Sequence, residues 1–384
     1  MAIKDSIHNH IELCELAKDL LDLPVVQRLR HIKQLSTVRL VYPSANHTRF
    51  EHSLGVYHLA SRATRNLEVS SDDARAVRAA ALLHDIGHGP YGHQTEPVIQ
   101  RRLNRHHDEV SELLTSSRAS DVLDDHGVST SRIVELIAGE GALGEIVSGE
   151  LDVDRADYLV RDAHHTGVPY GTIDHGRLLR AYSIVGDKLV LTEGNIATAE
   201  SILVARALMN ATVYRHHVSR IAGTMLERAV ERLLNTGDVD LETFARMTDD
   251  QLMAALRECP DTVEMANRLA ERRLFKRAIW ASHEETKDHA IDLSHKRTRE
   301  LEREIATLVD ISADKILIDS PRIQYMPESS AQVTVDGEHS RLGKHSPLVE
   351  GLDAAARAQW RLGVYTPSEH RESVRKAAER VLLH

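Results

Sequence analysis

The chain has 384 residues, with 48 Lys and Arg against 58 Asp and Glu and a formal net charge of −10. This acidic balance argues against a general nucleic-acid-binding surface. No apolar run is long enough to cross a membrane, and the N-terminus MAIKDSIHNH lacks a hydrophobic signal region. We therefore expect a cytoplasmic protein with no membrane partner.

Composition also limits the fold. Aromatic residues make up only 4% of the chain, so the core must consist mainly of Leu, Val, Ile and Ala, which favours helices. Two cysteines, Cys14 and Cys259, cannot form a disulfide framework and indicate a reducing compartment. We expect a mainly α fold: a helical catalytic core with a small β-hairpin over residues 1–280, and a small C-terminal α/β appendage over residues 281–384.

The first half of the chain predicts a series of helices. After an extended segment and a turn of helix, residues 22–35 carry apolar side chains on one helical face, with Pro24 in the first turn. Arg28, off the apolar stripe, is expected to face solvent. His52 stands at the start of the next helix, and further helices are expected over residues 72–86, 95–115, 129–148 and 150–165.

The second half adds strands. Residues 182–192 alternate around Gly186-Asp187 and predict a β-hairpin. One or two long helices are expected over residues 196–235, and two more over 240–280. Beyond residue 280 the pattern predicts a charged helix, two strands, an exposed loop and a closing helix, over residues 284–308, 315–319, 332–335, 337–347 and 374–383.

The segment AALLHDIGHGPYGH, residues 80–93, carries the strongest chemical signal. An apolar helical run places His84 and Asp85 side by side before two glycines and a proline. Adjacent helical residues point about 100° apart, so these two side chains cannot pair but can both reach one ion over the helix end. An imidazole and a carboxylate are ordinary ligands of a divalent cation. His88 and His93 follow closely enough to act on whatever that ion holds.

Two other segments supply further ligand types. His52 lies in TRFEHSLGVYHLA, and LDVDRADYLVRDAHHTG carries four aspartates on one predicted helix. Their order, H…HD…D, resembles that of the HD-domain metal-dependent phosphohydrolases. The resemblance implies a divalent metal ion, Mn, Fe, Mg or Ni, held by His52, His84, Asp85 and Asp154. The alternative is four unrelated core and surface residues.

Two helices carry polar side chains where a core face would be apolar. Asp154, Tyr158 and Asp162 follow one another at i, i+4 and i+8. A solvated face would carry more Glu and Lys and fewer tyrosines. The pattern indicates a pocket for an anionic ligand with a ring-shaped part, and it recurs on a later helix at Arg206, Asn210 and Tyr214.

Over residues 7–218 the successive motifs RLRHIKQL, RFEHSLGVYHLA, HDIGHGPYGH, HDEVS, DVDRADYLVRDAHHTG and RALMNATVYRHHV resemble those of the HD-domain deoxynucleoside triphosphate triphosphohydrolases, or dNTPases. This family includes the animal enzymes that join a SAM domain to an HD domain. The six motifs keep the family's order, whereas the region after residue 280 shows no clear match. The resemblance implies that a dNTP and water give a deoxynucleoside and inorganic triphosphate.

The same resemblance assigns substrate contacts. Three arginines would contact the triphosphate, because a guanidinium matches the geometry of a phosphate: Arg49, Arg155 and Arg206. Tyr214 would close over C2′ and leave no space for a ribose hydroxyl. At position 210 the family usually has His, whereas this chain has Asn210. The sugar would be bound or lined by Gln34, Leu35, Tyr158 and Asp162.

A general acid is implied as well. His93, held by Glu96 and near His107, would donate the proton to the departing 5′-oxygen, while Asp85 serves catalysis as a metal ligand. Glu96 stands where the family usually has Asp, and its extra methylene shifts the carboxylate.

Regulation and assembly also follow from the resemblance. Asp22, Gln27 and Arg30 stand where the animal enzyme reads an activating guanine nucleotide at a subunit boundary, although Lys4 replaces an asparagine. We therefore expect a homo-oligomer, dimer or tetramer, activated by GTP or a dNTP. The alternative is structural, with Asp22 as a helix N-cap and Arg30 as a surface charge.

Two other functions remain open at this point. One is an HD phosphohydrolase acting on a nucleoside monophosphate or a cyclic nucleotide, and the other is a nucleotide-sensing or RNA-binding non-enzyme. Three arginines favour a triphosphate, since a monophosphate needs fewer cations. The complete ligand set and His93 favour an enzyme.

Overall fold

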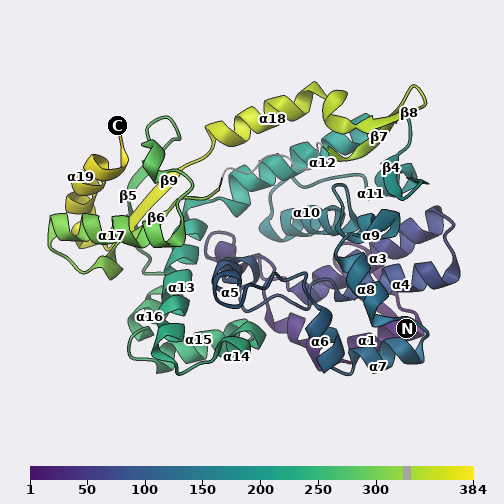
Figure 1. The fold of residues 1–384 in the computed structure, drawn as a ribbon, viewed down its shortest axis with the longest axis horizontal. Helices are drawn as coiled ribbons and strands as arrows, with labels where there is room; N and C mark the ends of the chain where they lie inside the picture. Colours follow the sequence, from purple (N-terminus) through teal and green to yellow (C-terminus); the bar gives the residue numbers. More distant parts are fainter. Residues whose placement is uncertain (323–329) are drawn as a thin grey trace.

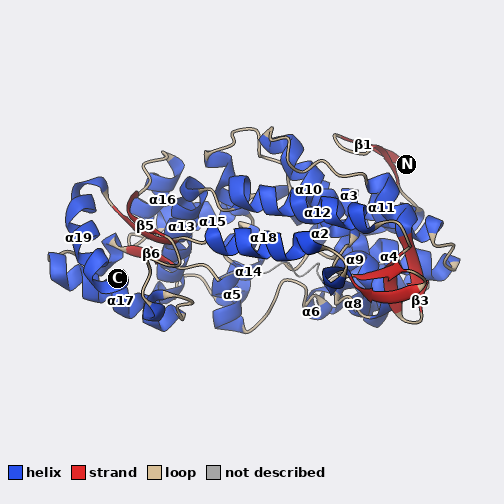
Figure 2. Ribbon diagram, turned by 90° about the horizontal axis from the view of Figure 1, so that it is seen from above, coloured by secondary structure: helices blue, strands red, loops and turns tan. Residues whose placement is uncertain are grey.

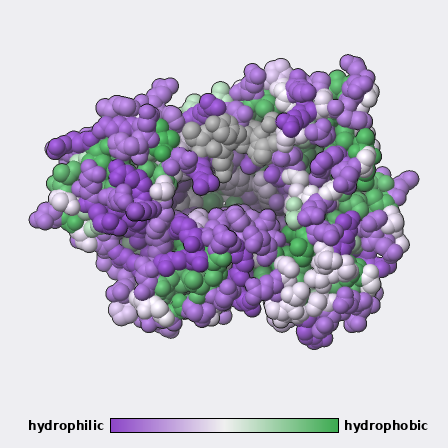
Figure 3. Space-filling view, in the orientation of Figure 1, coloured by the Kyte–Doolittle hydropathy of each residue, from purple (hydrophilic) through white to green (hydrophobic). Residues whose placement is uncertain are grey.

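The computed structural model describes residues 1–322 and 330–384, and its termini lie at opposite ends of the molecule (Figure 1). Helices dominate, and the strands form three small sheets (Figure 2). The predicted fold class, mainly α with small sheets, is confirmed. The face drawn in Figure 3 is largely hydrophilic, with apolar side chains in scattered groups.

Three helices form the centre of the first half. Helix α3 (Arg49–Asn66) starts at a capping box between Thr48 and Glu51, and packs on α4 (Ser71–Leu83) and α10 (Val153–Thr166). Their apolar faces join one large core. The surrounding helices are α1 (Glu15–Leu21), α2 (Pro24–Gln27), α5 (Glu96–Leu103), α6 (Ser111–Ser116), α7 (Ala119–Asp125), α8 (Thr130–Ile137), α9 (Gly141–Ser148) and α11 (His175–Ala181).

Three predicted helices of this half are interrupted, and the one expected over residues 129–148 divides into α8 and α9 around Gly139, where φ is 78°. Helix α2 passes into a 3₁₀ turn that ends at His31, because the backbone at Lys33 and Gln34 instead pairs with Thr48 and His47. The helix predicted over residues 95–115 splits into α5 and α6, since Asn104 ends α5 in the left-handed conformation (φ 50°).

The N-terminal strands β1 (Ala2–Asp5) and β2 (Asn9–Glu12) form a hairpin. The predicted hairpin of residues 182–192 is confirmed as β3 (Tyr182–Val185) and β4 (Lys188–Leu191). Strand β4 also pairs in parallel with the predicted strand β7 (Gln332–Val335). The loop prediction for residues 337–347 is wrong, because the Asp336-Gly337 turn returns the chain as β8 (Glu338–Arg341) against β7.

A long helical segment links the two halves. Helix α12 (Ile196–Met209) continues through a π-helical turn into α13 (His217–Thr236). By length and composition, Ile196–Tyr214 would suffice to cross a membrane, but α12 packs here against α10, α11 and α18 (Pro347–Ala358). Three helices follow where two were predicted, namely α14 (Leu241–Arg246), α15 (Asp249–Glu258) and α16 (Val263–Ala270).

The C-terminal region contains an antiparallel sheet in the order β5-β9-β6 (Lys276–Ala281, Leu362–Thr366 and Leu317–Asp319). Helices α17 (His295–Val309) and α19 (Arg371–Leu382) pack on it. The charged helix thus starts later than predicted, and the buried central strand β9 was not predicted. The boundary at residue 280 stays a prediction, although β5 runs across it.

Candidate functional site

Four side chains from three helices meet at one point. His52 lies in the first turn of α3, His84 and Asp85 follow the last residue of α4, and Asp154 lies in the first turn of α10. One ligand atom each from His52, His84 and Asp85 lies within 4.8 Å of the others. Asp154 Oδ1 lies 2.8 Å from His52 Nε2 and 3.7 Å from His84 Nε2. The structure therefore brings all four predicted metal ligands together.

The opposite ring nitrogens of the two histidines are already bonded. His52 Nδ1 lies 2.8 Å from Asp157 Oδ2, and His84 Nδ1 lies 2.9 Å from the carbonyl oxygen of Ala81. Such partners fix the tautomer that presents an Nε2 lone pair to a metal. His84 Nε2 is buried and lacks a hydrogen-bond partner among the described residues. A buried nitrogen of this kind beside two carboxylates fits a divalent cation.

The electrostatics of the cluster agree with this fit. Burial would raise the pKa of Asp85, but the Arg49 guanidinium and then His84 and His88 hold it well below its usual value. Burial lowers the pKa of His52, yet the Asp154 and Asp157 carboxylates raise it overall, to about 10. The same negative charge that retains a proton on His52 would attract a cation in its place.

Arg49 lies directly beside this cluster and is itself buried. One guanidinium nitrogen, Nη1, donates to Asp85 Oδ2 at 2.8 Å. Nε and Nη2 are buried without a partner in the part of the chain that is described. Gly92 allows this approach, because a Cβ there would lie 2.6 Å from Nη2. An anion bound next to the metal ligands would satisfy these two donors.

A cavity of about 650 Å³ opens over the metal cluster and Arg49. Ser36, Thr37 and Val38 also line it. It is lined as well by every residue that the resemblance assigned to the substrate: Gln34, Leu35, Arg49, Arg155, Tyr158, Asp162, Arg206 and Tyr214.

One wall of the cavity holds a bonded set of side chains. Tyr214 Oη donates to Asp162 Oδ2 at 2.7 Å, and His47 Nε2 lies 2.8 Å from Asp162 Oδ1. The rings of Tyr158 and Tyr214 meet edge to face at 6.4 Å. Gln34 Oε1 is buried and accepts no hydrogen bond from a described residue. This wall offers a flat aromatic surface with polar groups suited to a sugar hydroxyl.

The predicted general acid and its partners also come together. Glu96, the first residue of α5, accepts from His93 Nδ1 at 2.7 Å and from His107 Nδ1. Burial opposes ionisation of Glu96, but these two bonds hold its pKa well below the usual value. His88 stacks on His107 at 4.1 Å and lies 3.2 Å from Asp85 Oδ1. The four ligand-type groups of His88, His93, Glu96 and His107 are themselves close enough to hold an ion.

The loop that carries His93 is fixed from distant parts of the chain. Tyr91 adopts the left-handed conformation (φ 58°), which a bulky residue rarely does, and its N–H donates to Asp249 Oδ1 at 2.6 Å. Arg28 donates to the carbonyl oxygens of Ile86 and His88. The expectation of a solvated Arg28 is therefore wrong, because its guanidinium is used by the backbone of the HD turn.

The predicted regulatory residues lie outside the cavity. Asp22 caps the C-terminal end of α1, and the N-cap of α2 is Leu23, so Asp22 is not an N-cap. Gln27 donates to the Leu21 carbonyl oxygen at 2.6 Å, and Arg30 donates to Gln27 Oε1 at 2.8 Å.

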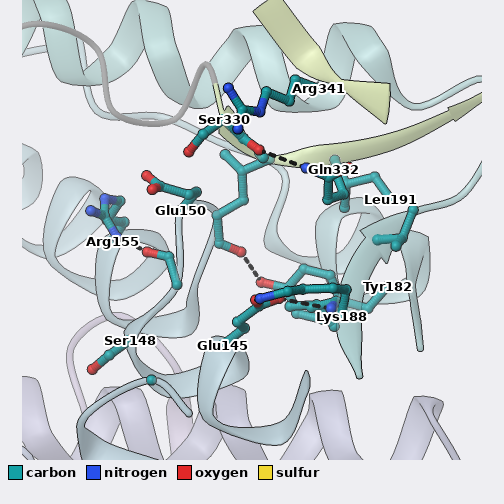
Figure 4. Close-up of a pocket in the computed structure, with 16 residues that line it drawn as sticks. Glu145, Ser148, Glu150, Arg155, Tyr182, Lys188, Leu191, Ser330, Gln332 and Arg341 are labelled. Carbon is teal, nitrogen blue, oxygen red and sulfur yellow. Dashed lines mark hydrogen bonds and ion pairs between the residues drawn. The ribbon is translucent and has the colours of Figure 1, made fainter. Parts of the chain in front are cut away.

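A second cavity of about 500 Å³ adjoins the first (Figure 4). It lies between the end of α9, β4 and the start of β7, and Arg155 and Ser148 line both cavities. Its lining includes Glu150, Lys188 and Arg341 but none of the four metal ligands. Of these two cavities, only the first is lined by the four predicted metal ligands.

Several contributing residues were not assigned a role from the sequence. In the sequence Asp157 is one of four aspartates on a predicted helix, and no local pattern gives His47 or Asp249 a role. Asp157 lies one helical turn after Asp154 on α10 and could have been inferred as a partner of a ligand. His47 and Asp249 act through long-range contacts that no local pattern indicates.

Comparisons with known proteins agree with this geometry. The HD domain family matches residues 49–162, and the HD associated region matches residues 173–383. An uncharacterized protein of Methanocaldococcus jannaschii is 34% identical over 97% of this chain and 81% of its own length. The deoxynucleoside triphosphate triphosphohydrolase SAMHD1 of Gallus gallus is 27% identical over 71% of this chain, which spans 55% of that protein. The crystal structure of a phosphohydrolase from Bacteroides thetaiotaomicron matches with a TM-score of 0.77 and 27% identity, covering 96% of this chain and 99% of that one.

Proposed function

The chain belongs to the HD-domain family of metal-dependent phosphohydrolases with an HD associated region, and from this premise we propose that it hydrolyses deoxynucleoside triphosphates to deoxynucleosides and inorganic triphosphate. The observation that carries the proposal is Arg49, whose Nε and Nη2 are buried beside the metal ligands and have no hydrogen-bond partner among the described residues. Arg155 and Arg206 line the same cavity, so three guanidinium groups surround the space for the phosphates.

The roles of the residues follow from their positions. His52, His84, Asp85 and Asp154 would hold the cation, which when bound supplies Lewis-acid activation of water and of the α-phosphate. The three arginines orient the triphosphate and offset the charge that develops on its oxygens. Water attacks the α-phosphorus and releases a proton to solvent, and the bond to O5′ breaks. His93 gives its own proton to O5′ while Glu96 holds the ring, and the released proton balances the one that His93 takes up again.

The sugar side of the cavity gives the specificity we propose. Asp162 and Gln34 would bind the 3′-hydroxyl, and Leu35 and Tyr158 would contact the sugar. The ring of Tyr214, held by its bond to Asp162, would occupy the space of a 2′-hydroxyl. A monophosphate or a cyclic nucleotide would use fewer of the three arginines than a triphosphate.

Product analysis tests the reaction. Chromatography of a dGTP digest is expected to show deoxyguanosine and triphosphate without dGMP. In the unchanged protein we expect kcat/KM for dGTP to exceed kcat/KM for GTP by about 10²-fold, the usual discrimination against an added hydroxyl. In Tyr214→Ala the two values should become similar. Tyr214→Phe keeps the ring but loses the bond to Asp162, and it should still discriminate if the volume of the ring excludes the 2′-hydroxyl.

Each failure has a different meaning. Release of dGMP, or activity only on monophosphates or cyclic nucleotides, would replace the triphosphohydrolase by another HD phosphohydrolase. Equal rates on GTP and dGTP would remove Tyr214 as a sugar gate. Binding of nucleotides without turnover on any of them, with metal present, would indicate a sensor.

We also propose that the protein is a cytoplasmic homo-oligomer, dimer or tetramer, activated by GTP or a dNTP at Asp22, Gln27 and Arg30. These side chains lie on a partly exposed surface, and Arg30 stacks over Phe50 at 3.6 Å, next to the active-site residue Arg49. A nucleotide bound there has a short path to the phosphate site through α3.

Added GTP or dGTP is expected to raise the rate of dATP hydrolysis by about tenfold, a usual size for coupling between two sites. The same addition should increase the mass measured by sedimentation. Arg30→Ala should lose this response. Arg65→Ala, which changes an exposed arginine at the far end of α3, should keep it. If the second nucleotide alters neither rate nor mass, this surface is structural only.

A further inference from the structure

The turn of the N-terminal hairpin reaches the metal centre through Asp157, and neither His8 nor Asp157 lines the cavity. His8, with only 4% of its side chain exposed, places Nε2 2.6 Å from Asp157 Oδ1. The other oxygen of Asp157 accepts from His52 Nδ1 at 2.8 Å. One carboxylate thus connects His8 to the metal ligand His52.

Asp157 is held on every side by charged or polar donors. Besides the two histidines, Arg161 donates to both of its oxygens, from Nε at 2.8 Å and from Nη2 at 3.0 Å. Asp157 and Arg161 have no measurable exposure. Gly55 on α3 admits this arrangement, because a Cβ there would lie 1.9 Å from Asp157 Oδ1. The carboxylate is therefore fixed in one orientation against α3, one turn from His52.

Asp5 completes the connection from the same turn. Its carboxylate accepts from Arg161 Nη1 at 2.8 Å and from the backbone N–H groups of Ile7 and His8 at 2.9 and 2.7 Å. The His8 ring in turn stacks on His58 of α3 at 4.9 Å. Asp5 thus shapes the turn that carries His8 and also fixes Arg161.

We propose that the Asp5–His8 turn is a positioning element of the metal centre, acting on His52 through Asp157. This inference rests on the metal site of the proposed function. Outer partners of a metal-bound histidine set its ring orientation and basicity, and their loss commonly costs about 10- to 100-fold in metal affinity. His8 and Asp5 touch neither substrate nor metal, so their effect must appear first in metal binding.

The test titrates full-length protein with Mn²⁺ and measures the free ion by electron paramagnetic resonance. His8→Ala is expected to raise the Kd for Mn²⁺ by about 10- to 100-fold, and His8→Gln, whose amide can still donate to Asp157, by less. Saturating Mn²⁺ should restore most of the activity of His8→Ala, which a folding defect would not allow. His10→Ala, on the exposed face of the same hairpin, is the matched control and should bind Mn²⁺ like the unchanged protein.

A Kd for His8→Ala equal to that of His10→Ala would overturn the proposal. Asp5→Asn provides a second variant if His8→Ala does not fold, and an unchanged Kd there has the same meaning. Unchanged protein that binds no Mn²⁺ would overturn the metal centre and this proposal together. Unchanged protein that binds Mn²⁺ but hydrolyses no dNTP would overturn only the proposed substrate, and the Kd shift in His8→Ala would still support the positioning role.

Discussion

Replacing His84 by alanine is expected to lower turnover by about 10³-fold or more and to remove most of the bound metal. A catalytic cation stabilises the transition state by several kcal/mol, and about 4 kcal/mol corresponds to that factor. His84 is the cleanest ligand to remove. Its Nε2 forms no hydrogen bond with a described residue, so its loss removes only the longer contacts with Asp85 and Asp154, at 3.5 and 3.7 Å, and the Nδ1 bond to the Ala81 carbonyl oxygen. Metal content by mass spectrometry and turnover on dGTP are the two measurements.

Asp85 gives an independent test of the same centre. Because Asp85 pairs with buried Arg49, an alanine there would leave an unpaired buried charge, which costs about 3–5 kcal/mol of stability. Asp85→Asn keeps the shape and removes the charge, and should also lose metal and activity. His289→Ala, an exposed histidine in the C-terminal region, should change neither. Full turnover in either ligand variant would contradict the assignment.

The three helices that hold the metal ligands were predictable because each has a local signal. Helix α3 begins at the Thr48–Glu51 capping box, and α4 begins after the Ser70 N-cap and ends in an apolar run. Helix α10 begins at the Asp152 N-cap, and Gly167 ends it with φ 74°. The ligands lie at helix ends, and the resemblance of their order, H…HD…D, to that of the HD phosphohydrolases nominates them. Their functional roles remain predictions, whereas their convergence is a finding of the structure.

Long-range contacts account for what the sequence did not reveal. The amphipathic pattern of residues 22–35 is real, but backbone pairing with the segment before α3 ends the helix at His31. Strand β9 is buried on both sides and lacks alternation, so its pattern does not separate it from helix. The contacts of Arg28 could not be predicted for the same reason, because only the folded chain brings the backbone carbonyls of Ile86 and His88 to its guanidinium.

The cluster of His88, His93, Glu96 and His107 has two interpretations: it holds the general acid, or it binds a second cation. His93→Ala is expected to lower turnover by roughly 10²-fold or more while metal is retained, the usual size of a general-acid contribution. The His93 side chain is 65% exposed, facing the cavity, whereas the other members of the cluster are more enclosed. Desolvation of the ring by the surrounding protein lowers the pKa of His93, and so does the charge of Arg49, whereas the hydrogen bond to Glu96 opposes them.

The dependence on pH gives the sharper measurement. A general acid must carry its proton, so kcat/KM of the unchanged protein should fall as pH rises through the pKa of His93, and this descending limb should disappear in His93→Ala. His106→Ala, an exposed neighbour of His107 that does not line the cavity, should keep both the rate and the limb. Loss of metal from His93→Ala would instead make His93 a ligand of a cation shared with His88, Glu96 and His107. Retained metal with a lost limb would leave His93 as the proton donor to O5′.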